Sequence, residues 1–471
     1  MIIRSQLLNS LREACVTMLA AGFTLISTQV IASGIEPGVL AVVLALSLSR
    51  SHLDRDRRGR IEAAIILPFI SLIAVASGFL LLHKPWLGAL LFIACMFISI
   101  WVRKFGAMAK RAGSLIALPF VVLLTTPYIA PERDQIIPAI LLPVVVAFFA
   151  LFWVSILHAA AERFHFLTVL KQVSPESMKI NKKNEAVLRP IASTRMAIQM
   201  AVALGISFLL GFLLFPTRWT WIVLTTIIVL SGNRGRLDVV HKSVLRVAGA
   251  AIGTFIAITI HTQMGLNALL SHGNIALILT SVFFAIWLRS ISYGWWALFI
   301  TLALALLQNF SGAQSSLGLR LEEIIFGAII GVFCAWFVLP VRSGAVLRRR
   351  LADALACLSE ALDPAILERS EEEFVAALGA VEQLLPAFNT AHLLTRYLTF
   401  ENPASGAIVL LTCKKIAINM IQEKQTPPTV RRAVGAARQS LREPAEIMSA
   451  MLALKETMLQ HAEKNQHRLV T

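Results

Sequence analysis

A few charged residues could do chemistry because they lie beside long apolar runs. Arg218 and Arg246 border two such runs, and Glu36 and Glu323 border two others. The guanidinium group of arginine matches a carboxylate with two hydrogen bonds, and a carboxyl group at a membrane edge can take up a proton. We therefore predict an organic-anion site at Arg218 and Arg246, and proton coupling through Glu36 or Glu323. The alternative for each is an interfacial residue that reaches water or anchors a helix end.

Aromatic residues accompany these charges. Trp219 and Trp221 follow Arg218 closely, and Tyr293 precedes Trp295 and Trp296. An aromatic belt at the membrane–water interface accounts for such residues at the ends of spans. The same rings can stack on an aromatic ligand. We therefore include Trp219, Trp221 and Tyr293 in the predicted substrate-binding set, with the belt as the alternative.

A second charged group is spaced for helical packing. Arg320 and Glu323 are three residues apart, so they can pair on one face of a helix. Two glycine pairs, Gly249 with Gly253 and Gly327 with Gly331, each have a four-residue interval. This interval lets another helix approach closely. We expect Arg320 to form a structural pair with its neighbouring glutamates.

Motifs for other chemistry are absent from the sequence. There is no G-x-x-x-x-G-K-[ST] loop, no G-x-S-x-G motif and no H-E-x-x-H motif. The five cysteines have neither metal-binding nor redox spacing. We expect no enzymatic activity, no catalytic residues, no metal and no cofactor. Energy for transport would then come from an ion gradient or from the gradient of the substrate itself.

The composition indicates which solvent surrounds these residues. Of 471 residues, 57% are hydrophobic and 15% are charged, and the mean hydropathy is +0.74. A soluble domain carries about 25% charged residues, so this chain could not cover a water-facing surface. The net charge of +16 lies in short loops and in the C-terminal tail. Anionic lipid accounts for that charge, and we expect no nucleic-acid partner.

Apolar runs without charge predict an all-α membrane protein of about twelve spans. The first run is too long for the apolar core of a signal peptide, so we expect it to be retained as a span. The spans are predicted over residues 14–34, 36–49, 62–82, 86–102, 112–130, 136–158, 196–215, 219–232, 244–262, 274–288, 294–310 and 321–339.

The spans divide into two halves followed by a tail. We predict a first six-helix transmembrane half at 1–160, a cytoplasmic linker at 161–194, a second half at 195–341 and a cytoplasmic helical domain at 342–471. Proline positions in the tail predict four or five amphipathic helices. Lysine and arginine gather in the loops on one side, whereas the other side holds only Lys84, Arg133, Arg218 and Arg320. This bias predicts that both termini are cytoplasmic.

The second span of each half is short. Charged residues limit these spans to about 20–22 Å, against a hydrocarbon thickness of about 30 Å. Proline precedes each span, at Pro37 and at Pro216. Short spans at matching positions of two halves point to the binding site of a transporter. The alternative is that each short helix is sheltered by its neighbours.

The second half resembles the fusaric acid resistance protein-like family of bacterial inner-membrane proteins, which includes aromatic acid exporters. The resemblance covers about 195–345 and departs from the family pattern at Ala250, where a threonine is usual. The motifs that carry it are Arg195 at the start of a span, Arg218-Trp219-Thr220-Trp221, the segment from Arg246 to Gly253, and Arg320-Leu321-Glu322-Glu323 with Gly327 and Gly331.

The resemblance implies efflux of aromatic carboxylic acids across the inner membrane, often beside a periplasmic adaptor subunit. It also implies similarity to plant anion channels that conduct malate. We therefore expect a proton-linked exporter of weak organic acids, with the lipid bilayer as its surroundings. A dimeric anion channel and a non-transporting membrane scaffold are the alternatives, and an adaptor subunit and a homo-oligomer stay open as partners.

Overall fold

The computed structural model contains only helices, turns and bends in the part of the chain that it describes. It describes residues 2–32, 35–50, 57–125, 141–164, 166, 192–216, 218–264, 272–310, 317–365, 371–395, 404–423, 427–443 and 446–470. Most of the predicted linker at 161–194 lies outside these residues. The all-helical class expected from the apolar runs is confirmed for the described part.

The chain forms two compact units. The first, here called the membrane unit, comprises Met1–Val169, Leu188–Gly232 and Lys242–Pro340. The second, the tail unit, comprises Leu170–Val187, Asn233–His241 and Val341–Thr471. Both predicted transmembrane halves therefore lie in one unit, apart from Asn233–His241 and Val341 of the second half. Their division into two halves remains a prediction.

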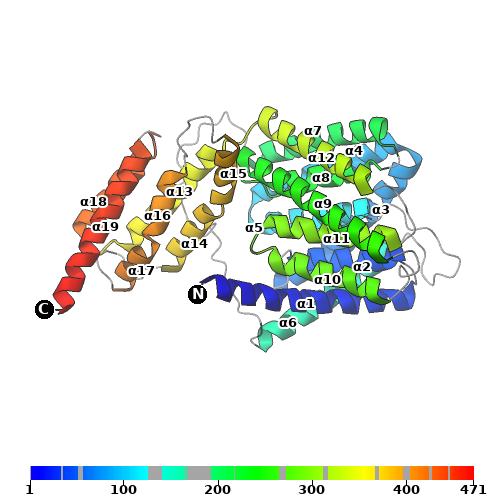
Figure 1. Ribbon diagram of the computed structural model, residues 1–471, viewed down its shortest axis with the longest axis horizontal. Coiled ribbons are helices and arrows are strands. Elements are labelled where there is room, and N and C mark those ends of the chain that lie inside the picture. The colour runs from blue at the N-terminus through cyan, green and yellow to red at the C-terminus, as the bar shows by residue number, and fades with distance from the viewer. Residues whose placement is uncertain are drawn as a thin grey trace. The chain divides into compact units, whose positions relative to one another are not determined.

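The helices of the membrane unit run side by side (Figure 1). Each of the twelve predicted spans overlaps one of them. In chain order they are α1 (Ile2–Ile31), α2 (Ile35–Arg50), α3 (Arg57–His83), α4 (Pro85–Trp101), α5 (Ala107–Thr125), α6 (Leu142–Arg163), α7 (Ala192–Leu214), α8 (Thr220–Leu230), α9 (Arg236–Met264), α10 (His272–Leu288), α11 (Tyr293–Phe310) and α12 (Leu317–Phe337).

Within the described residues, 6 helices are long and apolar enough to cross a membrane. They belong to α1, α3, α4, α6, α7 and α9, and shorter apolar helices belong to α2, α8, α10 and α11. So many long apolar helices make this a multi-pass membrane protein. The full count of spans remains a prediction.

The helices α1–α6, here called the first helix set, share four packing pairs with α7–α12, the second helix set. In the first set α1, α2 and α6 contact one another, and α4 contacts α5. In the second set α7, α8 and α12 contact one another, and α10 contacts α11. Between the sets, α4 packs on α7 and α1 packs on α10. These matching pairs are what a structural repeat produces.

The helix α8 is the shortest of the membrane unit. Its 11 residues cover about 16 Å, roughly half of a hydrocarbon core. Eight of them, from Ile222 to Leu230, are buried, and α8 packs against α5, α7 and α12. The short second span of the predicted second half is therefore sheltered by its neighbours. This agrees with the alternative interpretation of the short spans given above.

The tail unit has its own hydrophobic core. Amphipathic helices pack around Leu351, Leu355, Phe374, Leu410 and Met458, all of which are almost completely buried. The described helices after the membrane unit are α13 (Ser343–Ala361), α14 (Glu371–Glu382), α15 (Leu385–Thr395), α16 (Ser405–Thr412), α17 (Lys414–Gln422), α18 (Pro428–Ser440) and α19 (Ile447–Val470).

The prediction of four or five tail helices was too low. Proline marks most of the breaks, but α16 and α17 separate at Cys413, where no proline stands. Most of the apolar residues between Ala404 and Cys413 belong to the core of this unit. Burial raises the pKa of the Cys357 thiol to about 12, so this thiol stays protonated and acts as a packing residue.

Candidate anion site

The predicted charged residues of the second helix set meet where α8 and α12 pack together. Gly327 of α12 permits this close approach, because a Cβ atom at that position would lie 2.6 Å from the carbonyl oxygen of Ile222 in α8. Thr226 of α8 donates a hydrogen bond to the carbonyl oxygen of Gly327 at 3.1 Å. Its hydroxyl also forms a hydrogen bond with the hydroxyl of Ser207 on α7 at 2.8 Å. The glycine interval seen in the sequence therefore brings the short helix against α12.

Arg218 and Glu323 form an ion pair across this contact. The Nε atom of Arg218, just before α8, lies 3.2 Å from Oε1 of Glu323 on α12. The Arg218 side chain is 30% exposed, whereas that of Glu323 is completely buried. A carboxylate without water depends on its cationic partner to remain ionised. Glu323 is thus a buried carboxyl group paired with a partly exposed arginine.

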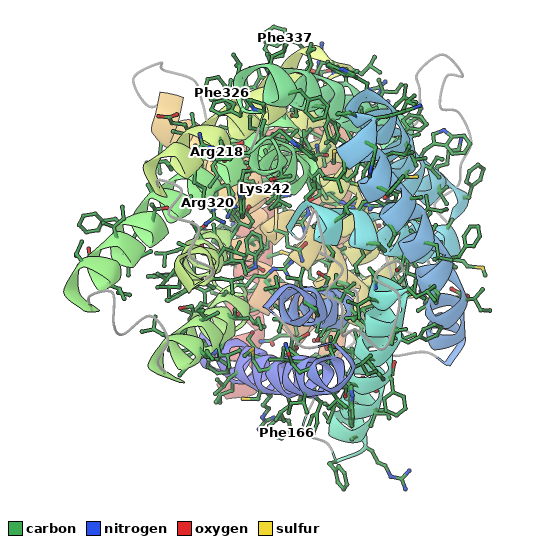
Figure 2. All side chains as sticks on the ribbon, turned by 90° about the vertical axis from the view of Figure 1, so that its right-hand side faces the viewer. Phe166, Arg218, Lys242, Arg320, Phe326 and Phe337 are labelled. Carbon is green, nitrogen blue, oxygen red and sulfur yellow. The ribbon has the colours of Figure 1, made fainter. Side chains whose placement is uncertain are left out.

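Arg320 lies over the ring of Trp221. Its guanidinium carbon is 3.6 Å from the ring centroid, within the range of a cation–π interaction. The side chain is buried, with 5% of its surface exposed. Figure 2 shows Arg320 and Arg218 near one another, and both interact electrostatically with Glu323. The face of Trp221 that we expected to receive a ligand ring therefore carries an arginine.

Arg246 is the most deeply buried of the arginines. Only 1% of it is exposed, and its Nη1 donates to Thr301 Oγ1 on α11 at 3.2 Å. Its Nε has no hydrogen-bond partner. The charge lies close enough to Arg320 for the two cations to repel one another, and Tyr293 is within electrostatic range. A guanidinium with five N–H donors thus has one hydroxyl as its hydrogen-bond partner among the described residues.

The position of Arg246 corrects the sequence interpretation. We expected this residue at the cytoplasmic start of a span beginning near residue 244, but α9 begins at Arg236. Arg246 therefore lies about 15 Å along the helix axis. The error arose because charged residues at 236–242 were assigned to a loop, although a helix can extend beyond its apolar part. Gly249 and Gly253 of α9 pack closely on Leu298 of α11, as their interval predicted.

Together, Arg218, Arg246, Arg320 and Glu323 form what we call the buried charge cluster. It contains three cations and one carboxylate, and three of its four members are almost fully buried. Removing an ion from water costs several kcal/mol unless another charge compensates. Within the described residues the positive charge exceeds the negative charge, so the cluster is suited to an added anion. Arginine forks could hold a carboxylate there through paired hydrogen bonds.

Two predicted site residues do not join the cluster. The ring of Trp219 packs against Phe208 and Phe212, with centroid distances of 5.5 and 5.3 Å. It thus belongs to an aromatic packing group that holds α7 beside α8. The side chain of Glu36 lies outside what the structure describes, although its backbone belongs to α2. Its predicted role in proton coupling stays a prediction.

The contacts of two further residues with the cluster were not predicted from the sequence. Arg320 was expected only to pair with its neighbouring glutamates, but it lies with Arg246 and Trp221 at the centre of the cluster. Thr301 was not considered. The available signal was that Thr301 is the single polar residue between Trp296 and Gln308. A lone hydroxyl in an apolar helix often donates to its own helix, as Thr301 does to Ala297 at 2.7 Å.

Comparison with known proteins connects this site to a family. Residues 202–343 match the family model described as fusaric acid resistance protein-like. No curated protein sequence matches the chain, and no solved structure does. The matched segment contains every member of the buried charge cluster. Residues 202–343 therefore form a fusaric acid resistance protein-like domain, which indicates a membrane transporter of the efflux type.

Proposed function

We propose that the protein exports weak organic acids, chiefly aromatic carboxylates, from the cytoplasm across the inner membrane. The observation that carries this proposal is the burial of Arg246, whose hydrogen-bond partner is the hydroxyl of Thr301. A buried guanidinium beside a second buried arginine is strongly disfavoured without a counter-ion. A bound carboxylate would supply that counter-ion.

In this proposal, Arg246 and Arg320 hold the carboxylate, and Tyr293 contacts the aromatic ring of the substrate. Trp221 holds Arg320 in place through its ring. Trp219 supports the site through its packing on Phe208. Glu323 carries the coupled proton, because protonation would break its ion pair with Arg218 and change the charge of the cluster. Glu36 is a second candidate for this proton.

The membrane arrangement that goes with this function has twelve spans and cytoplasmic termini. The concentration of lysine and arginine in alternate loops supports it. A reporter that is active only outside the cytoplasm should be active when fused after Gln135 or Ser311 and silent after Gly59 or Ser177. The reverse pattern at two of these positions would overturn the topology. The tail unit would then lie in the periplasm.

A dimeric anion channel is the second candidate. The excess positive charge of the cluster favours anions in a channel as much as in an exporter. Purified protein in liposomes distinguishes the two, with radiolabelled benzoate as the probe. An exporter gives saturable flux that depends on a pH gradient, whereas a channel gives ohmic current in a planar bilayer. A membrane scaffold gives neither, and that result would refute transport. An adaptor subunit would be sought by crosslinking in cells.

A further inference from the structure

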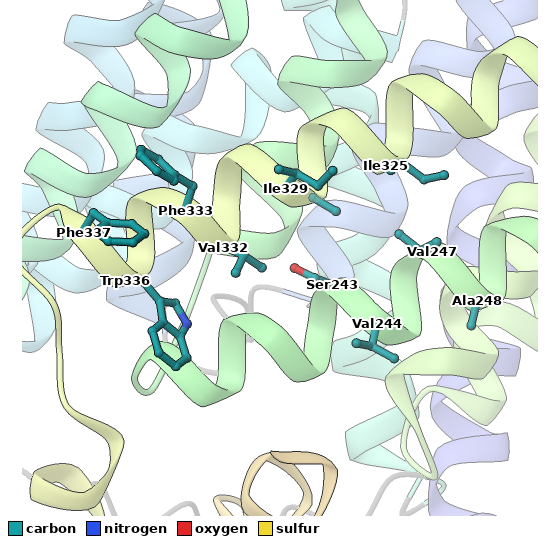
Figure 3. Close-up of a pocket in the computed structure, with 11 residues that line it drawn as sticks. Ser243, Val244, Val247, Ala248, Ile325, Ile329, Val332, Phe333, Trp336 and Phe337 are labelled. Atoms are coloured by element: carbon teal, nitrogen blue, oxygen red, sulfur yellow. The ribbon is translucent and has the colours of Figure 1, made fainter. Parts of the chain in front are cut away.

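A groove lies on the side of the membrane unit between α9 and α12. Figure 3 shows residues that line it, among them Val244 and Val247 of α9 and Ile329, Val332 and Phe333 of α12. The groove has a volume of about 720 Å³, within the range of pockets that hold small molecules. We call it the α9–α12 groove. Its walls are open to the surroundings, since Val244, Ile329 and Phe333 are 41%, 59% and 52% exposed.

An unsatisfied hydroxyl group lies directly beneath the lining of this groove. Ser243 borders the groove and is only 6% exposed. Its Oγ is buried and has no hydrogen-bond partner, whereas the other residues around the groove are hydrocarbon apart from the indole of Trp336. A serine in a membrane helix normally donates to its own backbone, as Ser281 does to Leu277 at 2.8 Å. A buried hydroxyl without a partner is costly to the fold, so this exception points to a ligand.

The chemistry of the groove selects an uncharged amphiphile. A carboxylate would be poorly solvated by hydrocarbon walls. A carboxylic acid in its protonated form has an O–H donor and a carbonyl acceptor, either of which Ser243 can satisfy. Its ring would fit among Val244, Val332 and Phe333. Weak aromatic acids dissolve in hydrocarbon in this form, and the groove opens on the exposed side of two membrane helices.

Ser243 also lies close to the buried charge cluster along α9. Ser243 and Arg246 are three residues apart on α9, which makes them neighbours on the helix surface. One helical turn therefore separates the unsatisfied hydroxyl from the buried guanidinium. We propose that the α9–α12 groove captures the uncharged form of the exported acid from the surrounding bilayer, with Ser243 as the polar contact. This proposal rests on the proposed export of weak acids.

Binding of an uncharged probe tests the groove directly. The full chain in lipid nanodiscs should bind radiolabelled methyl benzoate, measured against empty nanodiscs, with an affinity that does not change with pH. Ser243→Ala should weaken binding about 3- to 10-fold through loss of one hydrogen bond. The melting temperature of this variant should not fall, because the hydroxyl has no partner to lose. Ser281→Ala is the matched control and should bind as the wild type does.

A second pair of variants tests the space itself. Ala248 is exposed and lines the groove, so Ala248→Phe should fill it and abolish probe binding. Ile252→Phe, one turn further along α9 and 50% exposed, should have no effect. Unchanged probe binding by both Ser243→Ala and Ala248→Phe would overturn the proposal. Loss of co-purified phospholipid from Ala248→Phe with unchanged probe binding would assign the groove to a lipid chain and overturn it as well.

The variant Arg246→Ala separates this inference from the export function. It should bind methyl benzoate like the wild type, because the ester needs no cation, and it should fail to transport benzoate. If wild-type protein transports no acid, but binds the ester and loses that binding in Ser243→Ala, the proposed export function is wrong and the proposed groove site is supported. If benzoate transport is robust but neither groove variant alters ester binding or transport, the groove proposal fails alone.

Discussion

The two helix sets have the same packing but differ in what they bury. Each joins its first, second and sixth helices through hydroxyl groups. In the first set Thr17, Ser49 and His158 form a chain with distances of 2.7 and 2.8 Å. In the second set Ser207, Thr226 and the carbonyl of Gly327 do the same at 2.8 and 3.1 Å. The scaffold is thus alike in both sets.

Within the part of the chain that the structure describes, buried charges occur in the second set. Among the described residues, the buried polar side chains of the first set are all hydroxyls, such as Thr24 and Ser77. The second set buries Arg246, Arg320 and Glu323. Hydroxyl groups stabilise a helix junction at little cost, whereas buried charges destabilise the fold unless they are compensated. This difference is the reason that the proposed anion site belongs to the second set.

Replacing Arg246 should have the largest effect on transport, because Arg246 belongs to the charges that distinguish the second set. Arg246→Ala removes a charge-assisted contact worth about 1.5–3 kcal/mol, so the KM for benzoate should rise roughly 10- to 150-fold. Arg246→Lys should recover only part of the loss, because lysine lacks the guanidinium fork. Liposome uptake measures both.

The matched control for this change is Arg103 of the first set, whose Nε donates to the carbonyl of Ser99 in the preceding helical turn. Arg103→Ala should alter protein stability but not KM. An equal rise in KM for Arg103→Ala would show that the anion site extends into both sets. Full recovery by Arg246→Lys would instead make Arg246 a simple anchor.

Neutralising Glu323 should have the next largest effect. Glu323→Gln keeps the shape of the side chain but cannot be ionised, so the pair with Arg218 is lost. Uptake driven by a pH gradient should fall on the order of 10-fold, the scale of one charged contact, and should no longer vary with the gradient.

The exposed neighbour Glu322 provides the control. Glu322→Gln should keep the wild-type pH response, because its carboxylate is already in contact with solvent. If Glu323→Gln retains full gradient dependence, the proton is carried elsewhere, and Glu36 becomes the residue to replace.

Adding a methyl group at a close helix contact should affect both sets alike. A Cβ atom at Gly327 would lie 2.6 Å from the Ile222 carbonyl oxygen, and one at Gly113 would clash with the carbonyl oxygen of Ser99. Each alanine variant should lose about 1–3 kcal/mol of stability through overpacking, measured as a shift in melting temperature. Gly22→Ala, with open space around the added atom, should not be destabilised. A marked loss in only one set would refute the shared packing.

The hydroxyl chains should give the smallest effects, equal in the two sets. Ser49→Ala and Thr226→Val should each destabilise the protein by about 1 kcal/mol through loss of buried hydrogen bonds. Neither change should alter KM by more than about 3-fold. A large change in KM for Thr226→Val alone would extend the anion site from the arginines to α8.

Much of the membrane unit could be predicted because the bilayer imposes a simple rule. Long apolar runs must form helices there, and each predicted span overlaps a helix. Helix ends were less predictable, since charged residues such as Arg236 and Asp238 continue α9 beyond its apolar part. In the tail unit, the break at Cys413 has no proline to mark it, so the boundary between α16 and α17 could not be predicted.

Most of the residues of the site could be predicted from the sequence. The contacts among them could not. Arg218, Arg246 and Glu323 were identified from their places beside apolar runs. The contact of Arg320 with Trp221 depends on how closely α8 approaches α12. That distance is set by three-dimensional packing at Gly327, which residue spacing alone does not give. The unsatisfied hydroxyl of Ser243 likewise became visible only once its surroundings were known.

The contacts of α1 with α10 and of α4 with α7 are reciprocal, because the first helix of each set meets the fourth helix of the other. A two-fold rotation exchanges such a pair of contacts. The contact of α5 with α8 is not matched by an equally extensive contact of α2 with α11 among the described residues, so the exchange is incomplete. The arrangement thus resembles a dimer whose subunits are joined in one chain. The buried charges of the described residues lie in one of these two parts.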